Sequence, residues 1–150
     1  MSLRILIVED DALTAAAFAA ALNDAGHQVV AIADTAQAAL THADHAKTDL
    51  ALVDITLRDG RSGFAAARAL QADRIEVVLV SGDTNLRDKA DAVRAIDFVA
   101  KPADANSVAR IVSDVEQRLA RQGDGSDADQ STETRASAHM RERIAARTCW

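Results

Sequence analysis

Polar residues that could support metal and phosphate chemistry stand at the ends of short apolar runs in this sequence: Glu9, Asp10, Asp54, Ser81 and Lys101. If the runs are parallel strands, their carboxyl ends meet at one edge of a sheet, which is where ligands bind in open α/β folds. Three neighbouring carboxylates repel one another unless a cation neutralises them. Because oxygen ligands suit Mg²⁺, which takes about six of them, the cluster predicts a magnesium site.

The same group of residues has the parts that phosphoryl transfer requires. These are a nucleophile in line with the phosphorus, a metal bridging the oxygens and fixed donors for the developing charge. An aspartate can be the nucleophile and then forms an acyl phosphate. Lys101 and Ser81 can each bind a phosphoryl oxygen, whereas Asp34 would lie farther away if its strand is at the sheet edge. Nucleotide binding is disfavoured, because neither GxGxxG nor GxxxxGK[ST] occurs.

The elements that must position these residues alternate along the chain. We expect strands at residues 3–8, 28–32, 50–53, 75–80 and 96–99, and helices at 12–25, 35–46, 64–72, 84–93 and from Pro102 onward. Gly60 and Gly63 are placed in a loop. Two helical faces are apolar, one made of Leu13, Ala16, Ala17 and Ala20, the other of Val108, Ile111, Val112, Val115 and Leu119. Alternating strands and helices predict an α/β fold with a parallel sheet covered on both faces.

Composition and charge limit the partners and the cellular compartment that we expect. The chain has 150 residues, 49% of them hydrophobic, and a net charge of −6, so a nucleic-acid partner is not expected. Cys149 is the sole cysteine, which favours a reducing cytoplasm. The short apolar run at the N-terminus ends in acids and predicts neither a signal peptide nor a membrane span. We therefore expect a cytoplasmic protein without a membrane partner.

The chain is expected to divide into one domain and a tail. Residues 1–121 hold all the predicted elements, and residues 122–134 are rich in Gly, Ser, Asp, Thr and Gln, which predicts a linker or a disordered segment. Residues 135–150 carry a thin apolar stripe of Met140 and Ile144, which leaves a short docking helix and an unstructured tail as alternatives. The tail is too short to form an output domain.

Four motifs lie at the predicted strand ends: ILIVEDD (5–11), LALVDITLRDG (50–60), VVLVSGD (77–83) and DFVAKP (97–102). With these motifs the chain resembles the receiver domain of bacterial two-component response regulators, and the resemblance covers about residues 2–121. It implies a flavodoxin-like, doubly wound sheet of five parallel strands in the order 2-1-3-4-5, with five helices.

The resemblance also implies roles for residues at the predicted metal site. Asp54 corresponds to the phosphoacceptor. Glu9 and Asp10 correspond to the acidic pair that binds Mg²⁺, together with Asp54 and the backbone carbonyl of Thr56. Thr56 and Asp83 occupy positions at which family members vary, and we expect them to tune the lifetime of the acyl phosphate.

Three further residues correspond to the family's phosphoryl-binding and switch positions. Ser81 and Lys101 are expected to bind the phosphoryl group, and the bond from Lys101 to Pro102 is expected to be cis. Ser81 and Phe98 form the implied switch, in which the aromatic ring turns inward when Ser81 moves. Phe98 as ordinary core filling is the alternative.

The implied partners are proteins. A sensor histidine kinase or a histidine phosphotransfer protein would donate the phosphoryl group, and a downstream protein target would bind the switched surface. A homodimer through the fourth helix, fifth strand and fifth helix is a further expectation. The protein would assist its own phosphorylation and dephosphorylation without being a turnover enzyme.

Other readings of the sequence are a receiver-like docking module that acts without phosphorylation, and a phosphatase of the haloacid-dehalogenase type. The phosphatase would require DxDx[TV] at the first strand, whereas here Asp54 follows the third.

Two positions depart from the pattern of the receiver family: Arg58 replaces a common proline, and Ala95 with Ile96 replaces a Gly-Ala pair. His42 and His45 have a spacing that can bind metal, but lack a third ligand and are predicted to be solvated.

Overall fold

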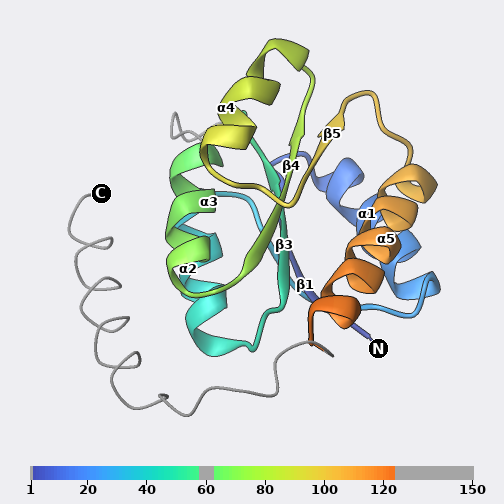
Figure 1. Cartoon of the computed structure of the whole chain (residues 1–150). Coiled ribbons are helices and arrows are strands. Elements are labelled where there is room, and N and C mark those ends of the chain that lie inside the picture. The colour runs from blue at the N-terminus through green and yellow to red at the C-terminus, as the bar shows by residue number, and fades with distance from the viewer. Residues whose placement is uncertain (1, 58–62, 124–150) are drawn as a thin grey trace, which may run out of the picture.

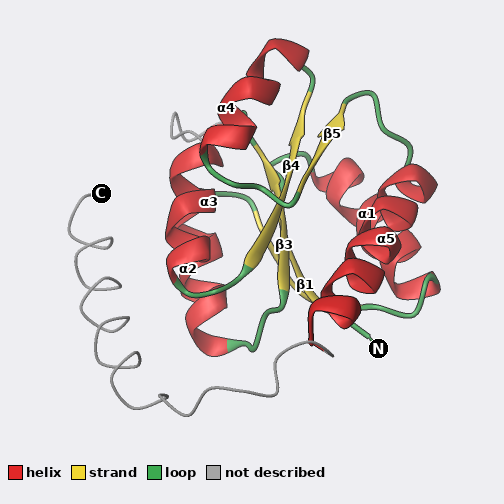
Figure 2. Cartoon of the chain, viewed as in Figure 1, coloured by secondary structure: helices red, strands yellow, loops and turns green. Residues whose placement is uncertain are grey.

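The computed structural model of the chain describes residues 2–57 and 63–123. Strands and helices alternate throughout these residues (Figures 1 and 2). In order they are β1 (Arg4–Val8), α1 (Ala12–Asp24), β2 (Gln28–Ala33), α2 (Ala36–His45), β3 (Leu50–Asp54), α3 (Gly63–Ala72), β4 (Glu76–Ser81), a 3-10 helix (Thr84–Leu86), α4 (Arg87–Ala92), β5 (Asp97–Ala100) and α5 (Ala105–Gly123). None of the helices in the described part of the chain is both long and apolar enough to cross a membrane.

The sheet has the predicted topology. Within the described residues it contains five strands, all parallel, in the order β2-β1-β3-β4-β5. Helices α1 and α5 cover one face, and α2, α3 and α4 cover the other (Figure 1). The predicted flavodoxin-like α/β fold is therefore confirmed.

Alternation along the strands builds a core on each face of the sheet. Ile5 and Ile7 of β1 pack in the core under α1 and α5, whereas Leu6 and Val8 pack in the core under α2 and α3. All four side chains are fully buried. A strand covered on both faces needs apolar residues at every position, which is why β1 reads as a continuous apolar run.

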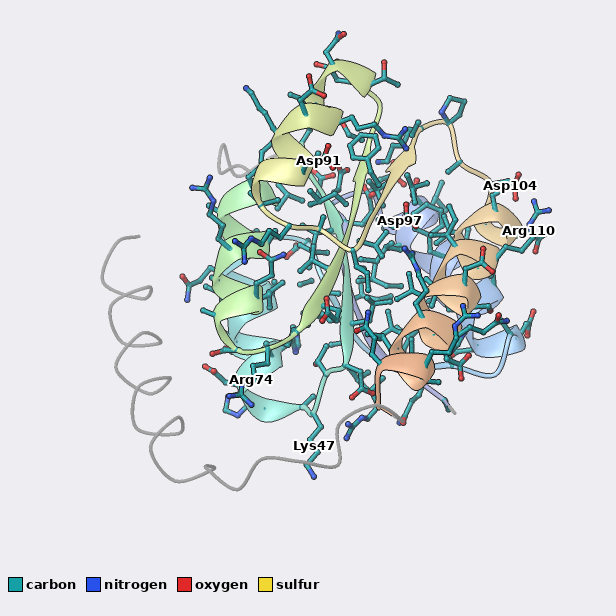
Figure 3. The ribbon with its side chains drawn as sticks, in the orientation of Figure 1. Lys47, Arg74, Asp91, Asp97, Asp104 and Arg110 are labelled. Atoms are coloured by element: carbon teal, nitrogen blue, oxygen red, sulfur yellow. The ribbon has the colours of Figure 1, made fainter. Side chains whose placement is uncertain are left out.

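Helix α5 begins at Ala105, so the prediction that Pro102 opens it is wrong. Asp104, which lies just before the helix (Figure 3), caps it instead, because its Oδ1 accepts a hydrogen bond from the Ser107 N–H at 2.8 Å. The bonds from Ser107 lower the pKa of Asp104. The Lys101–Pro102 peptide bond is cis, as the resemblance implied. The helix continues to Gly123, two residues beyond the predicted end of the domain at 121.

The face of α1 that the sequence marks as apolar is the exposed one. Leu13 is 85% exposed, while Ala15, Phe18 and Leu22 are buried against the sheet and α5. Because α1 is apolar on most of its circumference, periodicity alone does not identify its buried side.

Other boundaries move by at most one residue, and residues 84–86 form a 3-10 helix ahead of α4. Gly63 is the first residue of α3 and not part of a loop. Arg58, Gly60, residues 124–134 of the predicted linker, and the tail 135–150 with Cys149 lie outside the described residues.

An ion pair at the amino edge of the sheet joins β1 to the residue before β3. Asp49 accepts hydrogen bonds from the Arg4 backbone N–H, Nε and Nη2 at 2.8, 3.0 and 2.7 Å. These bonds from Arg4 hold the pKa of Asp49 below its ordinary value of 3.8. The carboxylate therefore stabilises the fold above that pH, and this contribution is lost as the pH falls through the lowered pKa.

Asp49→Asn is expected to lower the free energy of unfolding at pH 7 by about 1 kcal/mol, a value reduced for solvent screening because the two side chains of the pair are 39% and 31% exposed. Urea unfolding checks this, with Asp114→Asn as the control, because Asp114 is exposed on α5. The difference between Asp49→Asn and the native chain should shrink below pH 3.8. A difference that stays constant with pH would contradict the assignment.

Candidate functional site

The carboxyl edge of the sheet brings together the polar residues that the sequence placed at strand ends. Glu9 and Asp10 follow β1, Asp54 ends β3, and Ser81 ends β4. Lys101 follows β5, and its backbone N–H donates to the Ser81 carbonyl at 2.7 Å. Strand register sets this meeting point, because Val8 pairs with Val53, and Asp54 pairs with Val80 next to Ser81.

Three carboxylates lie close together in the site. Oxygens of Glu9, Asp10 and Asp54 all lie within 4.8 Å of one another, and this is the one such metal-ligating group among residues 2–57 and 63–123. Glu9 is 4% and Asp54 5% exposed, so two of the three are taken out of bulk water. Buried like charges at this separation strongly favour a cation or a proton.

Lys101 supplies one positive charge from the side of β5. Its Nζ donates to Asp54 Oδ2 at 2.9 Å and to Glu9 Oε2 at 3.0 Å. Burial lowers the pKa of Lys101, but the bonds to Asp54 and Glu9 together outweigh it, so the pKa is raised. The side chain is therefore an ammonium that bridges two buried carboxylates.

Backbone amides bind the other oxygens of the same two carboxylates. Asp54 Oδ1 accepts from the Thr56 N–H at 3.0 Å, and Glu9 Oε1 accepts from the Asp11 N–H at 3.1 Å. These donors lock the orientation of both side chains. They were not predicted, because any residue type except proline can supply a backbone N–H.

The pKa of Glu9 is raised, first by its burial and further by the nearby charge of Asp54, against the opposing bonds from Lys101 and Asp11. One lysine thus leaves the negative charge of the group incompletely balanced. Oxygen donors alone, partly buried and in excess of the local positive charge, are the set that Mg²⁺ prefers. Glu9, Asp10 and Asp54 fit such an ion, which would supply charge neutralisation for an incoming phosphoryl group.

Ser81 and Phe98, the predicted switch pair, lie on neighbouring strands. Ser81 is 1% exposed, and its Oγ accepts a hydrogen bond from the Asp83 N–H at 3.0 Å. Phe98 is buried in the core on the face of the sheet that α2, α3 and α4 cover, with the Arg87 guanidinium 5.6 Å from the centre of its ring. This cation–π contact between α4 and β5 was not anticipated from sequence.

The remaining candidate residues do not belong to the group of three carboxylates. The Asp83 carboxylate accepts from the Asn85 N–H at 3.0 Å and so caps its own turn. Thr56 is exposed beside Asp54, and Asp34 is exposed at the end of β2. His42 and His45 are exposed on α2 and do not join a metal-ligating group in the described part of the chain.

Family relationships agree with this geometry. The family described as the response regulator receiver domain matches residues 5–113. The chain belongs to the receiver domain family of response regulators. Receiver domains bind Mg²⁺ at an acidic pocket and generally interact with histidine kinases or phosphotransfer proteins and with downstream targets.

Two bacterial relatives of this receiver domain are longer regulatory proteins. The transcriptional regulatory protein PdtaR of Mycobacterium tuberculosis is 31% identical over 102 residues, covering 66% of this chain and 49% of PdtaR. The DNA-binding response regulator MtrA of the same organism is 32% identical over 127 residues, covering 83% of this chain and 54% of MtrA. The receiver domain thus spans about half the length of the curated relatives that it matches.

Solved structures show the same fold. The signal receiver domain of a modulated diguanylate cyclase from Desulfovibrio desulfuricans superposes with a TM-score of 0.69 at 27% identity, covering 79% of this chain and 98% of that domain. The metal-binding, phosphoacceptor, phosphoryl-binding, switch and tuning roles that the resemblance implies for individual residues of this receiver domain stay predictions.

Proposed function

We propose that this receiver domain acts as a stand-alone response regulator of a two-component phosphorelay. Asp54 accepts a phosphoryl group from a sensor histidine kinase or a histidine phosphotransfer protein in a Mg²⁺-dependent reaction. The observation that carries the proposal is the setting of Asp54: the residue is 5% exposed, and its carboxylate lies within 4.8 Å of carboxylate oxygens of Glu9 and Asp10 and is bound by Lys101.

In the proposed step an Asp54 oxygen attacks the phosphorus of a phosphohistidine. An O–P bond forms, the P–N bond breaks, and the imidazole nitrogen keeps the bonding electron pair. Lys101 Nζ, now 2.9 Å from Asp54 Oδ2, is close enough to transfer one hydrogen bond to a phosphoryl oxygen. Ser81 Oγ can donate to a second oxygen, because its hydroxyl proton is not needed for the bond that it accepts from Asp83.

The proposed output is contact with a downstream protein through α4, β5 and α5, or with a second copy of the chain through the same face. Donation by Ser81 to a phosphoryl group would turn its hydroxyl and alter the turn that begins at Asp83. That turn leads into the 3-10 helix and α4, which carries Arg87 over Phe98. A route of contacts therefore joins the phosphorylation site to the proposed output face.

Incubation with acetyl phosphate and Mg²⁺ is expected to add one phosphoryl mass to the native chain, and chelation of Mg²⁺ by EDTA should prevent the addition. Intact-mass spectrometry measures the mass that is added to the chain. Equal incorporation with and without EDTA would contradict the metal dependence. No incorporation with Mg²⁺, at a concentration at which calorimetry shows that the ion is bound, would contradict the role of Asp54 as a phosphoacceptor.

The same assay separates the two other readings. A docking module that acts without phosphorylation would show no Mg²⁺ binding by calorimetry and no mass increase. A phosphatase of the haloacid-dehalogenase type would release phosphate from an aryl phosphate over many turnovers. We expect a single stoichiometric addition and no such turnover.

A further inference from the structure

Gly63 lies directly against the backbone of the proposed phosphoacceptor. It is the first residue of α3, it is buried, and its N–H donates to the Ile55 carbonyl at 2.8 Å. The segment that ends in Asp54 and the helix that follows it are thereby joined by a backbone contact, with no side chain between them.

The contact leaves no room for a side chain. A Cβ atom built on Gly63 would lie 2.1 Å from the Asp54 carbonyl oxygen, 2.6 Å from Ile55 Cα and 2.9 Å from the Asp54 carbonyl carbon. Ordinary van der Waals contact begins at 3.4 Å. All three atoms belong to the main chain, so none can turn aside, and any larger residue would force α3 and the end of β3 apart by about 1 Å.

Both sides of this contact are held by other interactions. The Ile55 N–H donates to the Val80 carbonyl at 3.0 Å, which ties the end of β3 to β4. Helix α3 buries Ala66, Ala67 and Leu70 in the core beneath it. If a side chain at position 63 pushed α3 and the end of β3 apart, both elements would therefore move. Part of this displacement would shift Asp54 away from Lys101 and from the other two carboxylates.

We infer that Gly63 is a positioning residue for phosphoryl transfer: by allowing α3 to touch the main chain at Asp54 and Ile55, it sets where the Asp54 carboxylate stands relative to Glu9, Asp10 and Lys101. The inference rests on the proposed function of Asp54. Mg²⁺ demands near-ideal octahedral geometry, and an error of about 1 Å in a reacting group can cost about 100-fold in rate. The site therefore depends on a residue that takes no part in the chemistry.

Two controls separate positioning from stability. Leu70 is fully buried in the core, so Leu70→Ala removes packing from the same helix, and because it adds no atoms it does not push on Asp54. Gly26→Ala introduces a side chain at a glycine with a φ of 93° but with nothing within 4 Å of the new Cβ. Both should destabilise the fold while leaving the carboxylates in place.

The test compares Gly63→Ala with these controls in the full chain, in buffer containing sucrose, which favours the compact state. At saturating Mg²⁺, Gly63→Ala should lower the initial rate of phosphoryl incorporation from acetyl phosphate by about 100-fold. Its Mg²⁺ dissociation constant, measured by calorimetry, should rise by about 10-fold, because the carboxylates no longer match the ion. Leu70→Ala and Gly26→Ala should stay within about twofold of the native chain in both measurements.

Three other outcomes are possible, and each overturns either the inference about Gly63 or the proposed function. If Gly63→Ala is less stable but keeps native rate and Mg²⁺ affinity, α3 has absorbed the displacement and the inference is overturned. If it does not fold in sucrose while Leu70→Ala does, the glycine is required for the fold and not for the position of Asp54, which also overturns it. If the native chain itself takes up no phosphoryl group while binding Mg²⁺, it is the proposed function that fails.

Discussion

Asp54→Asn is expected to take up no phosphoryl group from acetyl phosphate and Mg²⁺ under conditions in which the native chain takes up one. The asparagine amide is nearly the same size and shape, but it lacks the negatively charged oxygen that attacks phosphorus. The Thr56 N–H can still donate to the amide oxygen, as it does to Asp54 Oδ1 at 3.0 Å. The variant should therefore keep its fold, and circular dichroism checks this alongside intact mass.

Asp34→Asn is the matched control for this experiment. Asp34 follows β2 at the same edge of the sheet but is exposed and lies outside the carboxylate group. It should be phosphorylated like the native chain. Incorporation into Asp54→Asn at native yield would show that another residue is the acceptor.

Lys101→Met is expected to change metal binding and phosphorylation in opposite directions. Lys101 Nζ is bonded to Glu9 Oε2 and Asp54 Oδ2, which are oxygens that belong to the proposed metal site. Removing its charge leaves three carboxylates without a cation, and the Mg²⁺ affinity should rise by about 10-fold. The phosphorylation rate should fall by about 100- to 1,000-fold, the usual effect of losing one donor to the developing charge.

Calorimetry and the acetyl phosphate assay measure the two effects on the same preparations. Lys47→Met serves as the control, because Lys47 is exposed beyond the amino edge of the sheet, at the opposite end of the molecule from the site (Figure 3). A Lys101→Met variant that loses both Mg²⁺ affinity and rate would indicate that the lysine organises the carboxylates, and not that it competes with the ion and then binds the phosphoryl group.

The buried face of a helix could be predicted from sequence for α5 but not for α1, and the reason is physical. In α5 the apolar residues recur with the helical period between charged ones, and Val108, Val112 and Val115 are buried as expected. In α1 the apolar face predicted around Leu13 is the solvent side, because seven of its 13 residues are alanines and these lie on all sides of the helix. Periodicity identifies a buried face only where the opposite face is polar.

The carboxylates, the hydroxyl and the lysine of the site were predictable because parallel strands place their carboxyl ends together. The N–H donors of Asp11 and Thr56 were not, because a backbone amide has no signature in the sequence. The role inferred for Gly63 depends on a contact between α3 and β3 that exists only in the folded chain. Such effects follow from tertiary geometry and not from residue type.

Chemical mapping of the phosphorylated residue tests the central claim most directly. An acyl phosphate on an aspartate is reduced by borohydride to homoserine, and peptide mass spectrometry then reports its position. After reaction with acetyl phosphate and Mg²⁺, homoserine should be found at position 54 and should be absent when the ion is chelated. Homoserine at position 10 or 83, or a phosphoryl group recovered on serine or histidine, would contradict the account.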